Sequence, residues 1–126
     1  MAGYRKGKAV KLTKNFKTTE FDCKCGKYCS TTLIDKALVN QLQMIRDHFD
    51  KPVLINSGYR CARHNRNVGG ANNSQHLYGK AADIVVKGVS PQTVAKYAES
   101  IGFKGIGTYK TFTHVDTRKK RARWQG

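Results

Sequence analysis

Two histidines and two aspartates are spaced in a way that suits metal chemistry. His76 and Asp83 lie seven positions apart, and the pair His114 and Asp116 follows about thirty residues later. Zn²⁺ binds imidazole nitrogen and carboxylate oxygen, and a catalytic zinc takes three protein ligands with a fourth position left for water. His76, Asp83 and His114 would supply that set, and the ion would lower the pKa of the water toward about 7. The alternative is that both histidines are ordinary surface or half-buried residues, and spacing alone leaves both interpretations open.

Four segments, two of which contain these residues, occur in the order in which a known family carries them. The segments are Ser57-Gly58-Tyr59-Arg60, Val68-Gly69-Gly70, the stretch from Ser74 to Asp83, and Gly105-Ile106-Gly107-x-Tyr109 leading to His114-Val115-Asp116. Together they resemble the zinc D-alanyl-D-alanine carboxypeptidase family, which includes phage endolysins that cut peptidoglycan stem peptides. The resemblance covers roughly residues 12 to 124. It implies a zinc metallopeptidase with one catalytic Zn²⁺, and peptidoglycan stem peptides as its substrate.

The same resemblance implies roles for residues around the expected metal. Arg60 matches an arginine that is expected to hold a substrate carboxylate or to polarise the scissile carbonyl, because its planar guanidinium binds oxygens in pairs. Ser74, Gln75 and Tyr109 are expected to line the substrate groove. Three of these residues have plainer alternatives: Arg60 as a solvated surface charge, Ser74 as the cap of a local turn, and Tyr109 as a core residue.

Asp116 is the candidate for the general base, by elimination. The chain has only two glutamates, and both Glu20 and Glu99 are remote from the metal motif in sequence. Asp116 would accept a proton from the attacking water and pass it to the leaving amine. Related carboxypeptidases often carry an acidic residue a few positions before the last histidine, whereas residues 110–113 here are Lys-Thr-Phe-Thr. The alternative for Asp116 is to orient His114.

Apolar periodicity predicts the elements that must position these residues. The pattern favours helices over residues 33–49 and from Ser90-Pro91 to Gly102, a helical turn at 61–67, strands at 53–55 and 81–86, and a hairpin of residues 104–109 and 112–117. Asp83 would lie on a buried strand with His76 on the loop before it. Because side chains alternate along a strand, His114 and Asp116 would share one face. The expected fold is α+β, a small antiparallel sheet flanked by helices, of the hedgehog and D-Ala-D-Ala-peptidase type.

The length of the chain predicts one small domain, and its charge predicts that it binds polyanions. The 126 residues suit an irregular basic arm at 1–17 and a single domain at 18–126, with a monomer as the default. The net charge of +16 attracts anionic polymers. Nucleic acid is one polyanion that such a charge would attract, but the sequence has no nucleic-acid-binding motif. Anionic cell-wall polymers are therefore the preferred partner. The basic cluster at residues 118–123 is also consistent with a solvated tail.

The sequence also gives expectations about targeting and about the class of function. No apolar run is long enough for a transmembrane helix, and Lys11 and Lys14 stand where a secretory signal would be apolar. The expectation is a protein made in the bacterial cytoplasm that acts at the wall as a phage or prophage lysin. The alternative from another class is a non-catalytic wall or polyanion binder that reuses the peptidase fold, such as a phage tail component.

Four cysteines, Cys23, Cys25, Cys29 and Cys61, require a separate explanation. Their number suits one structural zinc or two disulfides, and reduced, packed thiols are equally admissible in a bacterial cytosol. The Cys-x-Cys-x3-Cys spacing differs from the usual Cys-x2-Cys knuckle and gives a structural metal only weak support. A disulfide from Cys61 to one of the first three would tie the N-terminal turn to the sheet beside Arg60. The sequence leaves these states open.

Overall fold

The computed structural model describes all 126 residues, and it confirms the α+β class. In chain order the elements are β1 (Ala2–Arg5), the 3₁₀ helix η1 (Thr18–Phe21), β2 (Thr31–Ile34), α1 (Lys36–Phe49), β3 (Val53–Ser57), α2 (Ala62–Asn67), the 3₁₀ helix η2 (Gln75–Tyr78), β4 (Ala81–Val86), α3 (Pro91–Ser100), β5 (Gly105–Thr108), β6 (Thr113–Asp116) and β7 (Ala122–Gln125). The strands form a two-stranded sheet, β1-β2, and a five-stranded sheet in the order β3-β4-β6-β5-β7.

The five-stranded sheet is antiparallel between its first four strands, as expected from the sequence. Its edge strand β7 differs, because it runs parallel to β5 with Gly107 opposite Trp124. This strand was not anticipated, since its first two residues belong to the basic cluster at 118–123 that resembled a tail. The sheet is therefore mixed, and the C-terminal segment is part of the fold.

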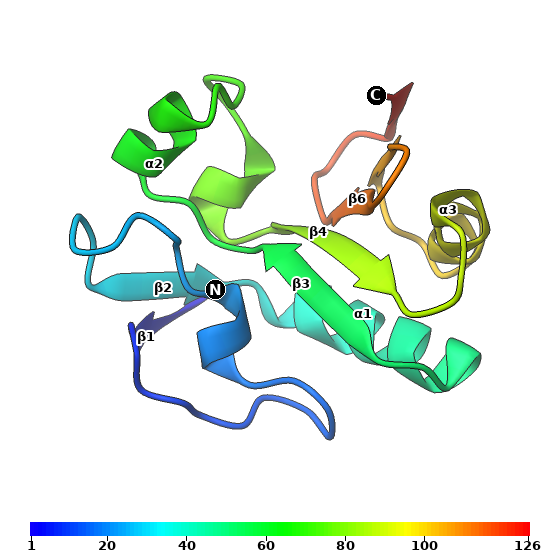
Figure 1. Cartoon of the computed structure of the whole chain (residues 1–126), viewed down its shortest axis with the longest axis horizontal. Helices are drawn as coiled ribbons and strands as arrows, with labels where there is room; N and C mark the ends of the chain where they lie inside the picture. The colour runs from blue at the N-terminus through cyan, green and yellow to red at the C-terminus, as the bar shows by residue number, and fades with distance from the viewer.

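The hydrophobic core lies on one face of this sheet, under two helices. Helix α1 packs against β4, and α3 packs against β5 and β6 (Figure 1). Alternate strand residues point into this layer, namely Ala82, Ile84 and Val86 of β4, Ile106 of β5 and Val115 of β6. By the same alternation the intervening residues of β4 and β6 face away from the helices. Those residues include Asp83, His114 and Asp116.

Local signals account for both long helices. Asp35 caps α1 by accepting a hydrogen bond from the Ala37 backbone N–H, and Asp50 ends the helix in the left-handed conformation. Helix α1 begins three residues later than expected, because Thr31–Ile34 pair with β1 as a strand. Helix α3 begins as predicted, with the Ser90 side chain accepting from the Thr93 backbone N–H. None of the helices combines the length and apolar composition that crossing a membrane requires.

The N-terminal residues are more ordered than the irregular arm expected for them. Ala2–Arg5 form strand β1, which pairs antiparallel with β2 at the left of Figure 1. Phe16 is buried in the main core and its ring contacts that of Phe21. Lys8, Lys11 and Lys14 are exposed, while Phe16 anchors the segment in the core. The boundary at residue 17 between an arm and a domain stays a prediction.

Candidate metal centre

The side chains of His76, Asp83 and His114 meet on the face of the sheet away from the helices. Asp83 on β4 and His114 on β6 are direct partners across the antiparallel ladder. Directly opposed residues on one face bring their side chains within about 4.5–5.5 Å at Cβ. His76 comes from η2, just before β4, and all three side chains are largely buried. The sheet register and the short 3₁₀ helix thus bring together residues that are up to 38 positions apart.

Both imidazole rings point one nitrogen at the same carboxylate oxygen. His76 Nε2 lies 3.2 Å from Asp83 Oδ1, and His114 Nδ1 lies 2.9 Å from it. The other ring nitrogen of each histidine is occupied. His76 Nδ1 donates to the Gly58 carbonyl over 2.7 Å, because a carbonyl can only accept. His114 Nε2 donates to Asp116 Oδ2 over 2.7 Å. These bonds fix both rings, so that His76 Nε2 and His114 Nδ1 face each other and Asp83.

This donor set fits a zinc ion. One ligand atom from each of the three residues lies within 4.8 Å of the others. Ligands at about 2.0–2.1 Å from a tetrahedral zinc are separated by about 3.3 Å. The two nitrogen–oxygen distances of 3.2 and 2.9 Å are close to that separation. Two imidazole nitrogens and one carboxylate oxygen also match the ligand types of catalytic zinc sites, which leave one coordination position open.

Hydrogen bonds around the cluster keep the carboxylates of Asp83 and Asp116 ionised. Burial alone would raise the pKa of Asp83, but hydrogen bonds from His114 and His76 hold that pKa well below its usual range. Burial would lower the pKa of His114, yet its bonds to Asp116 and Asp83 raise the pKa above the ordinary value. A buried, ionised carboxylate next to imidazole favours a cation at this point.

Asp116 lies behind His114 and is fully buried. Its Oδ2 accepts from His114 and, over 2.7 Å, from Arg118 Nη2, while its Oδ1 accepts from Arg118 Nε over 2.8 Å and from the Arg118 backbone N–H over 3.1 Å. Despite burial, these bonds hold the pKa of Asp116 well below its usual range. The carboxylate lies directly over Gly105 of β5, where any Cβ would collide with it. This placement suits the orienting role considered for Asp116 better than the role of a base.

Arg60 lies at the edge of the same cluster. Its Nη2 is 3.4 Å from Asp83 Oδ2, its Nε donates to Ser57 Oγ over 3.1 Å, and its Nη1 is 3.4 Å from Asn65 Oδ1. The guanidinium is therefore held in place by side chains of β3 and α2 instead of extending into solvent. The alternative of a solvated surface charge does not describe this arginine.

A cleft of about 470 Å³ opens over the metal cluster, and it includes all the expected groove residues. It is lined by Arg60, Val68, Gly69, Gly70, Ala71, Asn73, Ser74, Gln75, His76, Asp83, Tyr109, Phe112, His114, Arg118 and Trp124. Ser74 also caps η2, since its Oγ accepts from the His76 backbone N–H over 3.3 Å. Tyr109 stacks on Phe112 with ring centroids 4.3 Å apart, and its hydroxyl accepts from Trp124 Nε1 over 2.9 Å.

Three groups of the site were missed by sequence reasoning. Trp124 forms part of the cleft wall, with its ring centroid 5.0 Å from that of His114. Arg118 holds Asp116, and the Gly58 carbonyl holds His76. The Trp124 position depends on strand β7, and a backbone carbonyl has no sequence signal. Only Arg118, two residues after Asp116, offered a signal, which its place in a basic run concealed.

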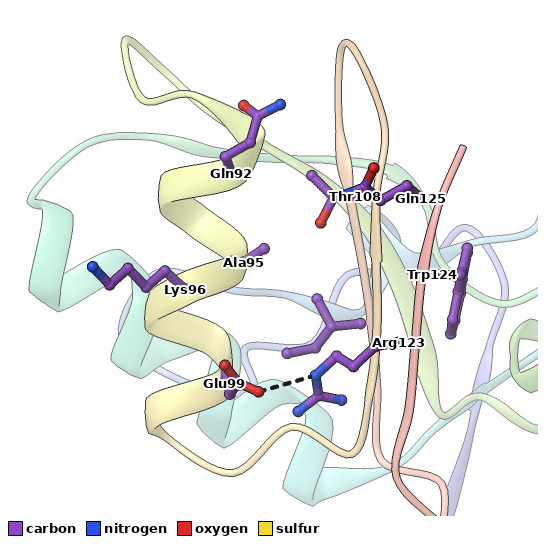
Figure 2. A pocket seen from close by; sticks show the side chains of 9 residues that line it. Gln92, Ala95, Lys96, Glu99, Thr108, Arg123, Trp124 and Gln125 are labelled. Atoms are coloured by element: carbon purple, nitrogen blue, oxygen red, sulfur yellow. Dashed lines mark hydrogen bonds and ion pairs between the residues drawn. The ribbon is translucent and has the colours of Figure 1, made fainter.

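A second cavity, of about 510 Å³, lies between α3 and β7 on the helix side of the sheet (Figure 2). Figure 2 shows Glu99 of α3 facing Arg123 of β7, and the two are ion-paired at 3.3 Å. Arg121 also pairs with Glu99. With Arg118 bound to Asp116, three arginines of the C-terminal basic cluster have partners within the fold. The expected solvated tail therefore does not describe these three residues.

Comparison with known proteins identifies a family and relatives to which this chain is similar. Residues 14–116 match the family model described as Peptidase M15. The zinc D-Ala-D-Ala carboxypeptidase of Streptomyces albus G is 40% identical over an alignment of 98 positions, which covers 71% of this chain and 38% of that protein. The peptidoglycan L,D-endopeptidase MepK of Escherichia coli K12 is 32% identical over an alignment of 128 positions, which covers 94% of this chain and 66% of that protein. The chain thus spans less than two thirds of the length of either relative.

Proposed function

The chain belongs to the Peptidase M15 family, and on that premise we propose that it is a zinc-dependent peptidase that hydrolyses amide bonds in peptidoglycan stem peptides. The observation that carries the proposal is the convergence of His76 Nε2 and His114 Nδ1 on Asp83 at the floor of an open cleft. Two relatives named for peptidoglycan or D-Ala-D-Ala hydrolysis support the substrate class. The sequence resemblance described above points to the same chemistry.

His76, Asp83 and His114 would hold the ion, and the surrounding residues would keep them in place. When bound there, Zn²⁺ would polarise a substrate carbonyl and lower the pKa of a water molecule. The Gly58 carbonyl and Asp116 each accept the proton of the second ring nitrogen, so neither histidine can rotate away without losing a buried hydrogen bond. Such outer contacts set the tautomer and orientation of metal-binding histidines.

Arg60 would bind the substrate next to this centre. Its guanidinium borders both Asp83 and the cleft, and Ser57 and Asn65 hold its orientation. A fixed guanidinium can bind a substrate carboxylate or the developing negative charge on a scissile carbonyl oxygen. Ser74, Gln75 and Tyr109 would hydrogen-bond the stem peptide along the cleft, with Trp124 and Phe112 supplying apolar walls.

Asp116 acts as a positioning residue in this proposal. Both of its oxygens already accept hydrogen bonds, and His114 stands between it and the oxygen of Asp83. A general base must come within hydrogen-bond reach of the proton that it removes. The only carboxylate among the cleft-lining residues is that of Asp83. The prediction that Asp116 transfers the proton is tested by replacing it with asparagine.

The charge of the chain suits a wall-degrading role. The net charge of +16 would draw the protein to anionic wall polymers, which raises its concentration at the substrate. We include in the proposal a lysin-like role, in which the protein is made in a bacterial cytoplasm during phage or prophage lysis and acts as a monomer. Purified wall from a susceptible host would then be degraded in bulk, beyond the trimming of single terminal residues.

The test is digestion of purified peptidoglycan by zinc-loaded protein, with released fragments identified by mass spectrometry. One wall preparation should carry pentapeptide stems that end in D-Ala-D-Ala, and a second should be rich in cross-links. His76→Ala is the inactive control, and His64→Ala on α2, which does not line the cleft, is the matched control. Free D-Ala would identify a carboxypeptidase, and new internal peptide termini would identify an endopeptidase.

The controls decide between catalysis and binding. We expect cleavage by the wild type and His64→Ala and none by a folded His76→Ala protein. Absence of cleavage by zinc-loaded wild type on both walls would contradict the proposal and favour a non-catalytic wall binder. Cleavage by His76→Ala equal to that of the wild type would remove the metal cluster from the mechanism.

A further inference from the structure

The four cysteines of the chain form a second cluster with metal-binding geometry, separate from the catalytic centre. Cys23, Cys25 and Cys29 lie between η1 and β2, and Cys61 lies between Arg60 and helix α2. The four sulfur atoms all lie within 4.8 Å of one another. We propose that these four thiolates bind a structural Zn²⁺ that holds the N-terminal third of the chain against the wall of the cleft.

The sulfur–sulfur distances support a shared ion over two independent disulfides. Tetrahedral zinc holds thiolate sulfurs at about 2.3 Å, which separates neighbouring sulfurs by about 3.8 Å. The Cys23 and Cys61 sulfurs are 3.7 Å apart, and those of Cys25 and Cys29 are 3.4 Å apart. Two disulfides need closeness only within each pair. Here both pairs also lie against each other, as one tetrahedral site requires.

Groups around the cluster are suited to its negative charge. Zn²⁺ with four thiolates is a dianion, and its binding sends the thiol protons to solvent. Lys6 Nζ lies 3.3 Å from the Cys25 sulfur and 3.9 Å from the Cys29 sulfur, and it is held there by donating to the Gly26 carbonyl over 2.8 Å. The backbone N–H of Cys61 donates to the Cys23 sulfur over 3.4 Å. A cation and an N–H group directed at sulfur stabilise thiolates more than neutral thiols.

The position of the cluster gives it a structural task. Cys61 directly follows Arg60, and the nearby Gly58 carbonyl orients His76. The Tyr59 backbone N–H bonds to the Phe21 carbonyl over 2.9 Å, and a Cβ at Gly58 would collide with the Phe21 backbone. The segment that carries two functional groups of the cleft is therefore pressed against the chain just before Cys23. An ion bridging Cys23 and Cys61 would lock this contact.

A contact between side chains also joins the cysteine-bearing loop to helix α2. The Arg63 guanidinium of α2 lies 3.7 Å from the centroid of the Tyr28 ring, which belongs to the cysteine-bearing loop. This cation–π contact joins the two segments that supply the four sulfurs. No strand pairing joins the two segments, so a metal would add rigidity between them.

Metal content measured in four forms of the reduced, purified protein tests the proposal. The forms are the wild type, His76→Ala, Cys25→Ser and the double variant. With both sites filled we expect about two zinc ions per chain in the wild type, about one in each single variant and none in the double variant. If only the catalytic assignment is wrong, the wild type and His76→Ala would both hold about one ion and Cys25→Ser none.

Cobalt substitution of the His76→Ala protein gives a readout that does not depend on activity or on the folding of a cysteine variant. Tetrathiolate cobalt should show sulfur-to-metal charge-transfer absorption that a histidine and carboxylate site lacks. A thiol-specific mercurial should abolish that absorption and release zinc from the zinc-loaded protein. The proposal is overturned if His76→Ala incubated with excess zinc still has four freely reacting thiols, if intact mass shows two disulfides in protein purified without an oxidant, or if the cluster holds iron.

Discussion

Replacing Asp116 with asparagine separates the two roles considered for this residue. The substitution keeps the size of the side chain and removes its charge. In the structure Asp116 accepts from His114 Nε2, from Nε and Nη2 of Arg118 and from the Arg118 backbone N–H. An asparagine offers one oxygen and a donor amide in place of two accepting oxygens. The amide would face either His114 or Arg118, both of which donate, so at least one buried hydrogen bond is lost.

The expected magnitude follows from the position of Asp116 behind a metal ligand. Loss of such an outer contact typically lowers metal affinity or activity by about 10–100-fold, which corresponds to about 1.4–2.7 kcal/mol. The broken pairing with Arg118 should also lower the free energy of unfolding by about 2–3 kcal/mol, because Asp116 is fully buried while Arg118 retains some contact with water.

The assay measures zinc affinity by competition with a chelator and kcat at saturating zinc. If Asp116 positions His114, the variant should bind zinc more weakly and recover most of its kcat when zinc is saturating. Asp50→Asn is the matched control, since Asp50 is 93% exposed and asparagine tolerates its left-handed backbone. A variant with unchanged zinc affinity and a kcat reduced by about 10²–10⁴ would refute this reasoning and identify Asp116 as the base.

Other substitutions test the remaining contacts. Gly105→Ala should lower the free energy of unfolding by about 1–3 kcal/mol and weaken zinc binding, measured by denaturant titration and chelator competition, because its Cβ would displace the Asp116 carboxylate. Arg60→Lys should retain zinc but lose at least about tenfold in kcat/KM, since an ammonium cannot bind oxygens in pairs; unchanged kinetics would exclude Arg60 from substrate binding. Ser90→Ala should cost about 1 kcal/mol of stability by removing the α3 cap, with activity unchanged. Retention on immobilised anionic wall polymer should fall steeply as salt rises, and salt-independent binding would contradict the electrostatic attraction.

The sequence was sufficient for the elements that rest on local signals. The Ser90-Pro91 start of α3, the helical spacing of α1 and the apolar run of β4 were each confirmed, because capping and periodicity depend on neighbouring residues. The family resemblance, carried by ordered motifs, was confirmed by the match to Peptidase M15 over residues 14–116. Strands β1, β2 and β7 were missed, because short edge strands are defined by their partners more than by their own residues.

The chemical state of the four cysteines could not be predicted from their positions along the chain. Their spacing differed from common zinc knuckles and left disulfide, thiol and metal open. Only the fold brings Cys61 back across 38 positions to meet Cys23. Distances between sulfurs, and the approach of Lys6, depend on how two irregular segments pack, which no local pattern encodes.

The sequence by itself determined which residue types were available for metal chemistry and, through strand alternation, that His114 and Asp116 share a face. Tertiary structure alone decided their orientation. The pairing of β4 with β6 sets Asp83 opposite His114, the Gly58 carbonyl turns His76 toward them, and Arg118 holds Asp116 behind His114. Ligand identity follows from side-chain chemistry, which the sequence states directly. The direction in which each ring nitrogen points follows from hydrogen bonds between distant segments, and these exist only once the chain has folded.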